Sequence, residues 1–426
     1  MRPRLGSSVT TSSMFSPTFE HVADAGDGAV EVERLVGQRL VAAEREELTR
    51  QVRGALRGDL DLLEVLVHGV LGLVAREQEL AATEDHREHI VEVVRAAAGE
   101  APDRLDLLHL AQNARVYSPA VETPHRLRVV EAFRSIFYAP PFVAIHGGHF
   151  AAEGLDVTMT TAPRSAATVD ALLGGQADLA LSGLMRSFDL ADRGATRLVH
   201  FAAVNDRNGF FLLGREPRSR FSWSDLVGRT VISFGGAPTP WLCMQAVLRR
   251  HGVDPARVTF VRDLSGPDAV AAFRARKAAF IELGPPAVDQ LIDDGTGYLL
   301  ASMGDATGSV PFSSLMTTPE ILEREREVLV RFVRGLYRAQ RWMAARGPSA
   351  IAAVLAPAFP DVDPGILARA VARYFRQSTW ATDPVLTRTG FDALQSILLA
   401  AGFIKRSHRF EDLVDTDIAR QAVQTI

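Results

Sequence analysis

A glycine-rich loop between a strand and a helix is the stretch whose residues best suit ligand binding. Residues 230–234 are an apolar, β-branched run typical of a buried strand, and residues 241–251 have helical spacing. Residues 235–240 read Gly-Gly-Ala-Pro-Thr-Pro, which predicts Thr239 as the helix N-cap and Pro240 as the first helical residue. Such a loop directs several backbone N–H groups into one space, which the helix dipole makes attractive to anions. The alternative is an ordinary βα turn without a ligand.

Composition limits the classes of function. The chain has 426 residues, room for two or three domains at about 150 residues each. Its net charge of −4 gives no reason to expect nucleic-acid binding. Cys243 is the single cysteine, so an internal disulfide or a cysteine-based metal cluster is excluded. His146 and His149 flank two glycines, but we favour helix-end packing over a metal pair and predict no metal and no cofactor.

The first 125 residues differ in pattern from the rest. We expect residues 1–28 to be disordered, 29–113 to form a small helical domain, and 114–125 to be a linker. No apolar signal-peptide core follows Met1, and the apolar run at 62–75 is too short to span a membrane. We therefore expect a cytoplasmic protein, or a periplasmic or extracytoplasmic one if the start is misassigned.

From residue 126 onward strands and helices alternate, which predicts an α/β fold with mostly parallel pairing. The predicted strands are 127–133, 155–161, 177–181, 196–204, 209–213, 230–234, 258–261, 279–283 and 313–318. The predicted helices are 140–146, 165–173, 185–192, 241–251, 267–276, 321–345, 349–355, 364–376 and 392–401.

A series of short motifs in this part resembles a known family. They read GHFAAEGLDV at 148–157, LGGQADLALSG at 173–183, LVGRTV at 226–231, RHGVDP at 250–255 and IELGPP at 281–286, and the tail at 402–415 also fits. Their order and spacing resemble the type II periplasmic-binding-protein fold of ABC importers, in the branch for alkanesulfonates, taurine, nitrate and thiamine-pyrimidine precursors. The resemblance covers 126–426 and implies two lobes, lobe I from 126–215 with 313–426 and lobe II from 216–312.

The chain also departs from that family. Members serving importers carry an export signal or a lipobox cysteine and lack the helical segment before Pro119. Desulfinases of the same fold use a cysteine nucleophile in the first loop, where this chain has Arg134-Ser-Ile-Phe-Tyr138. Cys243 lies in the other lobe within an apolar helix, and we interpret it as a small buried hydrophobe.

The resemblance places a ligand between the lobes, at the carboxyl ends of the strands. Arg134 could pair with a carboxylate or sulfonate, and an aromatic ring of the same loop could stack on a ligand ring. The alternatives are a surface arginine, core aromatics, plain turns and, for Glu282, a salt bridge to arginine. The predicted ligand-binding residues are Arg134, Phe137, Tyr138, Ser182, Gly183, Gly235, Gly236, Ala237, Thr239 and Glu282.

Three hypotheses of function remain open. The leading one is a substrate-binding protein of the ABC-transporter type. It would capture a sulfonate, an aromatic acid or a pyrimidine or thiamine precursor by lobe closure, with an ABC permease as partner. The second is a cytoplasmic desulfinase- or lyase-like enzyme, which would need His146, His149, Glu282 or Arg134 to converge, and we assign no catalytic residue. The third is a ligand sensor that binds a cytoplasmic partner through residues 30–112.

Overall fold

The computed structural model describes residues 123–195 and 197–425. The predicted disordered N-terminus, the helical domain at 29–113 and most of the linker lie outside the described residues. None of the helices in the described part combines the length and the apolar character that crossing a membrane requires.

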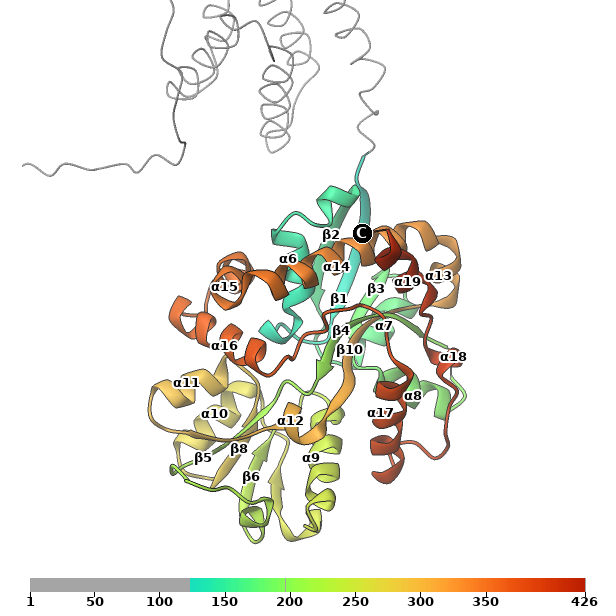
Figure 1. The fold of residues 1–426 in the computed structure, drawn as a ribbon. Helices are drawn as coiled ribbons and strands as arrows, with labels where there is room; N and C mark the ends of the chain where they lie inside the picture. Colours follow the sequence, from blue (N-terminus) through green and yellow to red (C-terminus); the bar gives the residue numbers. More distant parts are fainter. Residues whose placement is uncertain (1–122, 196, 426) are drawn as a thin grey trace, which may run out of the picture. The chain divides into compact units, whose positions relative to one another are not determined.

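The described chain forms two five-stranded sheets, one above the other in Figure 1. The first has the order β2-β1-β3-β10-β4, and the second has the order β7-β6-β8-β5-β9. The strands of the first are β1 (His125–Glu131), β2 (Leu155–Thr161), β3 (Leu179–Ser182), β4 (Val199–Arg207) and β10 (Ser309–Thr317). Those of the second are β5 (Phe211–Gly214), β6 (Thr230–Ser233), β7 (Thr259–Val261), β8 (Phe280–Leu283) and β9 (Tyr298–Ser302).

Both sheets are mixed, so the predicted α/β class is confirmed while the mostly parallel pairing is corrected. β10 runs antiparallel to β3 and β4, and β5 runs antiparallel to β8 and β9. These strands lie next to the two points where the chain changes sheets. The chain crosses after β4 and returns after β9, a few residues before the limits of 215 and 312 that the sequence predicts. An apolar run such as 209–213 does not itself show which sheet it joins.

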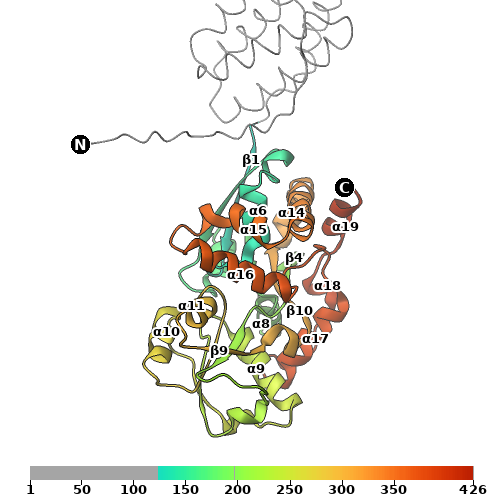
Figure 2. The ribbon, with the colours of Figure 1, turned by 60° about the vertical axis from the view of Figure 1, so that its left-hand side comes forward.

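Helices cover both sheets. Those of the first lobe are α6 (Ala139–His146), α7 (Ala167–Leu173), α8 (Met185–Asp192), α13 (Pro319–Arg324), α14 (Arg326–Arg346), α15 (Pro348–Leu355), α16 (Pro364–Arg376), α17 (Arg388–Ala400), α18 (Phe410–Leu413) and α19 (Asp417–Gln424). α14, α15 and α16 lie together on one side of this lobe (Figure 2). The single helix predicted at 321–345 is two helices, because Glu325 leaves helical geometry at φ −106° and ends α13.

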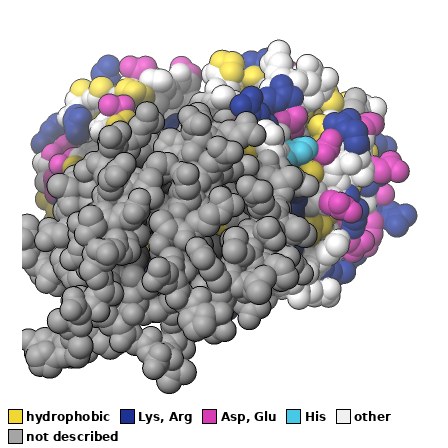
Figure 3. All heavy atoms as spheres, turned by 90° about the horizontal axis from the view of Figure 1, so that it is seen from above, with side chains coloured by type: hydrophobic (Ala, Val, Ile, Leu, Met, Phe, Trp, Pro, Cys, Tyr) yellow, Lys and Arg dark blue, Asp and Glu magenta, His cyan; other side chains and the backbone are white. Residues whose placement is uncertain are grey.

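The second lobe carries α9 (Pro238–Arg250), α10 (Gly266–Arg274), α11 (Ala287–Asp293) and α12 (Met303–Thr307). α17 packs against both β10 and α9 and so joins the lobes, as Figure 1 shows. A buried ion pair joins them again, since Arg373 of α16 lies 2.7 Å from Asp289 of α11. On the face seen in Figure 3, basic and acidic side chains of the described residues are interspersed and form no patch of one sign.

Candidate functional site

A small cavity lies where chain segments that follow strands of both sheets meet. Its free volume is about 20 Å³, which is room for roughly one water molecule. The first sheet contributes the residues after β1 and β3, and the second contributes the residues after β6 and the start of α9. The lining residues are Ala132, Phe133, Tyr138, Ser165, Ser182, Gly183, Met185, Arg186, Phe210, Phe234, Ala237, Thr239, Pro240, Phe312 and Ser313.

Arg186 is the cation of this cavity. It lies in the first turn of α8, is half-buried, and donates a 2.8 Å hydrogen bond from Nη2 to Ser165 Oγ. No carboxylate of residues 123–195 or 197–425 forms an ion pair with it. Burial lowers the pKa of Arg186, because removing water disfavours the charged form. The charge of Asp189 acts on Arg186 without forming an ion pair, and a half-buried guanidinium with no ion-pair partner among the described residues favours an anionic ligand.

Ser165 joins Arg186 to the second lobe. Its hydroxyl accepts from Arg186 and donates a 2.8 Å hydrogen bond to the carbonyl of Gly236, in the loop after β6. Thr168 donates to the Ser165 carbonyl at 2.9 Å, and its hydroxyl oxygen lies 3.4 Å from Ser182 Oγ. These short polar side chains therefore form a connected row of hydroxyl groups beside the guanidinium.

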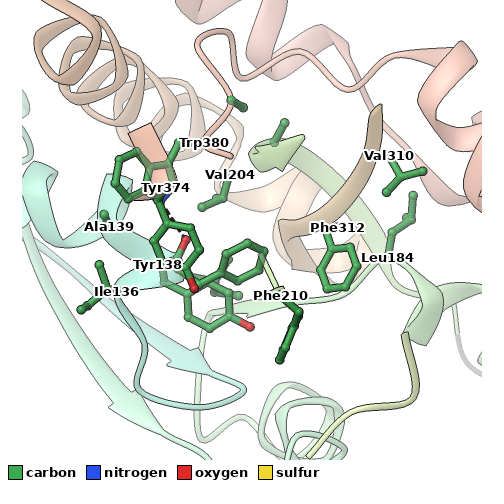
Figure 4. Packing of buried hydrophobic residues seen from close by; sticks show 14 of the residues in the cluster. Ile136, Tyr138, Ala139, Leu184, Val204, Phe210, Val310, Phe312, Tyr374 and Trp380 are labelled. Atoms are coloured by element: carbon green, nitrogen blue, oxygen red, sulfur yellow. Dashed lines mark hydrogen bonds between the residues drawn. The ribbon is translucent and has the colours of Figure 1, made fainter. Parts of the chain in front are cut away.

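Aromatic rings form a large part of the cavity lining. Phe133, after β1, meets Phe234, after β6, edge to face with ring centroids 5.6 Å apart. Phe210 lies 4.9 Å from Phe234 and 6.3 Å from Phe312. Figure 4 shows Tyr138, Phe210 and Phe312 gathered in one part of the core. Burial raises the pKa of Tyr138 well above its usual value, so its hydroxyl stays neutral.

The N-terminus of α9 differs from the prediction. The helix begins at Pro238, with Ala237 as an N-cap that makes no side-chain hydrogen bond, so Thr239 is not the cap. Pro238 takes the first position because its fixed φ suits it. Thr239 is instead buried inside the first turn and lines the cavity. Pro238 and Pro240 carry no N–H, so this end offers fewer donors to an anion than the loop sequence suggested.

Of the ten predicted ligand-binding residues, the structure brings five to the cavity. These are Tyr138, Ser182, Gly183, Ala237 and Thr239. The other five do not line it, and they are Arg134, Phe137, Gly235, Gly236 and Glu282.

Arg134 and Phe137 are occupied by other contacts. Arg134 Nε donates to Glu131 Oε1 at 2.5 Å, and its guanidinium lies 4.6 Å from the Phe142 ring centroid. Because Glu131 is fully buried, this arginine compensates an internal charge. The ring of Phe137 is part of the core, and its carbonyl accepts from Asn205 Nδ2 at 2.7 Å.

In the second lobe, Glu282 is fully buried at the end of β8. Ser233 Oγ donates a very short hydrogen bond to its Oε2, and burial raises the pKa of Glu282 to about 7. Gly235 passes close to another loop, where a Cβ would lie 1.9 Å from the Arg262 carbonyl oxygen. Gly236 contributes only its carbonyl, which accepts from Ser165.

The residues that sequence reasoning missed include the cation itself. Arg186 and Ser165 belong to α8 and to the turn before α7, and neither follows a strand directly. The Phe133 and Phe234 rings do follow strands, at β1 and β6, so position alone was a usable signal for them. His146 and His149 do not line the cavity. In the described part of the chain, no three His, Cys, Asp or Glu side chains are grouped so as to hold a metal ion.

Two mixed sheets, two chain crossings and a cavity between strand ends define a two-lobed type II periplasmic-binding-protein fold. Residues 132–356, more than half of the chain, match the NMT1-like family, and the chain belongs to that family. It is also similar to YtlA of Bacillus subtilis (strain 168), a protein named only provisionally as a binding protein. The two are 29% identical over 302 residues, which cover 70% of this chain and 90% of YtlA.

Solved structures share the fold at low identity. The alkanesulfonate-binding protein SsuA from Xanthomonas axonopodis pv. citri, bound to MOPS, has a TM-score of 0.53 and 19% identity, covering 67% of this chain and 95% of its own. The periplasmic nitrate-binding protein NrtA from Synechocystis PCC 6803 has a TM-score of 0.55 and 14% identity, covering 72% of this chain and 89% of its own. The ligands in these names are ligands of those two proteins, and the likeness to this chain concerns the fold.

Proposed function

We propose that this protein is a solute-binding protein of the ABC-transporter type that captures a small organic anion between its two lobes. The observation that carries the proposal is Arg186, a half-buried cation at the cavity with no carboxylate partner among the described residues. An ionised acidic group of a ligand would supply the missing negative charge through charge-assisted hydrogen bonds.

Lobe closure follows from the arrangement of the polar contacts. Ser165 already connects the first lobe to the Gly236 carbonyl of the second. The cavity is too small for an organic ligand unless the lobes part, since its free volume is about 20 Å³. Ligand entry therefore requires opening, and capture requires closing around the ligand.

Ligand binding is tested by thermal unfolding and calorimetry on the full chain. Sulfonates, aromatic acids, aminopyrimidines and nitrate are offered one at a time, with sodium chloride at equal ionic strength as control. We expect at least one organic anion to raise the melting temperature and to reduce the radius of gyration in small-angle X-ray scattering. A folded protein that none of these anions stabilises would remove the basis of the proposal.

The partner follows from where the protein acts. An ABC permease is the proposed partner outside the cytoplasm, and a protein bound through residues 30–112 is the proposed partner inside it. Cell fractionation distinguishes the two. Deleting 30–112 should abolish capture of a cytoplasmic partner while leaving ligand affinity intact. If the deletion removes ligand affinity as well, the segment has a structural role instead.

A further inference from the structure

We propose that the ligand is an aromatic monoanion, a flat ring that carries one acidic group and no positive charge. The inference rests on the proposed function at the same cavity and narrows it to one class of solute. It follows from two independent features of the lining, its charge and its rings.

The charge of the lining matches a single negative group. Among the described residues, Arg186 is the one cation of the lining, and none of the lining side chains is a carboxylate. Buried carboxyls end two nearby strands, but Glu131 is engaged by Arg134 and Thr161, and Glu282 is engaged by Ser233. One oxygen of each is buried without a partner, yet neither residue reaches the lining.

The absence of a lining carboxylate disfavours ligands that carry an ammonium group. Such a ligand would bring a second cation next to Arg186 and would lose its hydration without an acidic partner. Glu282 is one of the residues that the sequence predicts to bind the ligand, and a carboxylate at the site would favour a cationic ligand group. Since the Glu282 side chain is turned into a hydrogen bond with Ser233, that reason no longer applies.

The rings of the lining select a flat, aromatic solute. Phe133 of the first lobe and Phe234 of the second both line the cavity and contact each other, and Phe210 and Phe312 line the same space. Aromatic rings interact favourably at centroid separations of 4.5–7 Å in stacked or edge-to-face geometry, beyond the effect of buried area. A ligand ring entering between Phe133 and Phe234 keeps both in such contacts, whereas an alkyl group supplies area only.

The aromatic lining disfavours small inorganic anions as the preferred ligand. Nitrate could pair with Arg186, but it would leave the Phe133 and Phe234 rings with no ligand surface to cover. An aromatic acid carries both an acidic group that Arg186 can pair with and a ring that the lining phenylalanines can contact. The carboxylate and sulfonate forms share this chemistry.

Calorimetry on the full chain tests the class with a matched set of probes. These are benzoate and benzenesulfonate, cyclohexanecarboxylate as the non-aromatic match, 4-(aminomethyl)benzoate as the zwitterionic match, and methanesulfonate and nitrate as small anions. We expect benzoate or benzenesulfonate to bind at least tenfold more tightly than each of the other four. Which of the two binds better identifies the acidic group.

Other outcomes overturn the inference in distinct ways. Equal affinity for cyclohexanecarboxylate refutes the aromatic part, and equal affinity for 4-(aminomethyl)benzoate refutes the charge part. Preference for nitrate or methanesulfonate refutes the inference while leaving a small-anion-binding function in place. If neither these probes nor the broader panel binds, the proposed function itself fails.

A phenylalanine variant locates the preference in the cavity. Phe234→Leu should reduce the affinity for the tighter-binding aromatic probe about tenfold and should reduce the ratio of that affinity to the affinity for cyclohexanecarboxylate. Phe221→Leu is the matched control, because its ring packs 5.2 Å from Trp223 in the second lobe and does not line the cavity. The ratio between probes is unaffected by a loss of folded protein. An unchanged ratio in Phe234→Leu contradicts the inference.

Discussion

Replacing Arg186 with glutamine should weaken anion binding strongly while leaving the folding stability nearly unchanged. A hydrogen bond to a charged group contributes about 1.5–3 kcal/mol. Arg186 is half-buried and has no competing carboxylate among the described residues, so we expect the upper part of this range. A loss of about 2–3 kcal/mol corresponds to a dissociation constant that rises roughly 30- to 150-fold.

The stability of the same variant follows from what Arg186 contacts without a ligand. Its hydrogen bond to Ser165 also involves the charged guanidinium and contributes about 1.5–3 kcal/mol. Removing a desolvated charge that has no acidic partner offsets this loss. The free energy of unfolding should therefore change by about 1 kcal/mol or less.

Arg134→Gln is the control with the same chemical change. Arg134 compensates the buried carboxylate of Glu131, so its loss should lower the free energy of unfolding by about 2 kcal/mol. Affinity for the anion should stay within about twofold, because Arg134 does not line the cavity. Urea unfolding gives the free energy of unfolding of each variant, and calorimetry gives the dissociation constant of the anion for each variant. The reverse pattern, with affinity lost in Arg134→Gln and kept in Arg186→Gln, would refute the assignment.

Three further predictions concern buried groups and a close backbone contact. Burial raises the pKa of Glu282 to about 7 in the folded protein. Between about pH 4.5 and 7 the folded chain therefore binds more protons than the unfolded chain, and the free energy of unfolding should fall as the pH rises through this range. Urea unfolding across this range should show Glu282→Gln lacking that fall of about 3 kcal/mol, and a pH-independent difference from the parent would contradict it. His200, buried between Ser187 and Ser314, has its pKa lowered to about 3, so the unfolded chain binds the proton first and stability should fall as pH drops below about 6.5. His200→Gln should flatten that acid limb in the same titration, and an unchanged slope would exclude His200 as its source. Gly235→Ala places a methyl group against the Arg262 carbonyl oxygen and should lower the free energy of unfolding by about 1–3 kcal/mol. An unchanged melting temperature in a thermal scan would contradict this prediction and show that the loop can move.

Local periodicity predicted much of the fold. The helices predicted at 185–192 and 364–376 have the same bounds as α8 and α16, because their apolar spacing is that of a helix and, for α16, the Asp363 side chain caps the N-terminus. β9 was missed, since Tyr298–Ser302 is a short edge strand that depends on pairing with β5 for its existence. Both sheets are mixed because of how distant segments pair, and the spacing of residues along the chain does not predict the direction of that pairing.

The site was less predictable because it depends on which face of a helix meets the other lobe. Arg186 lies in an amphipathic helix, where an arginine normally belongs to the solvated face. Arg134 had the expected position after a strand, yet Glu131 three residues earlier neutralises it. That pair was visible in the sequence as a close opposite charge. Glu282 belongs to a strand whose four residues are all buried, and its carboxylate hydrogen-bonds with Ser233 and does not line the cavity.

A crystal structure of the full chain with its tightest-binding organic anion tests the central claim most directly. We predict that the acidic group lies within hydrogen-bonding distance of the Arg186 guanidinium, between the two lobes, with Ser165 beside it. A second groove lies by Arg197, Arg388 and Arg420, away from this cavity. An anion bound in that groove or elsewhere, with Arg186 making no contact to it, would contradict the account.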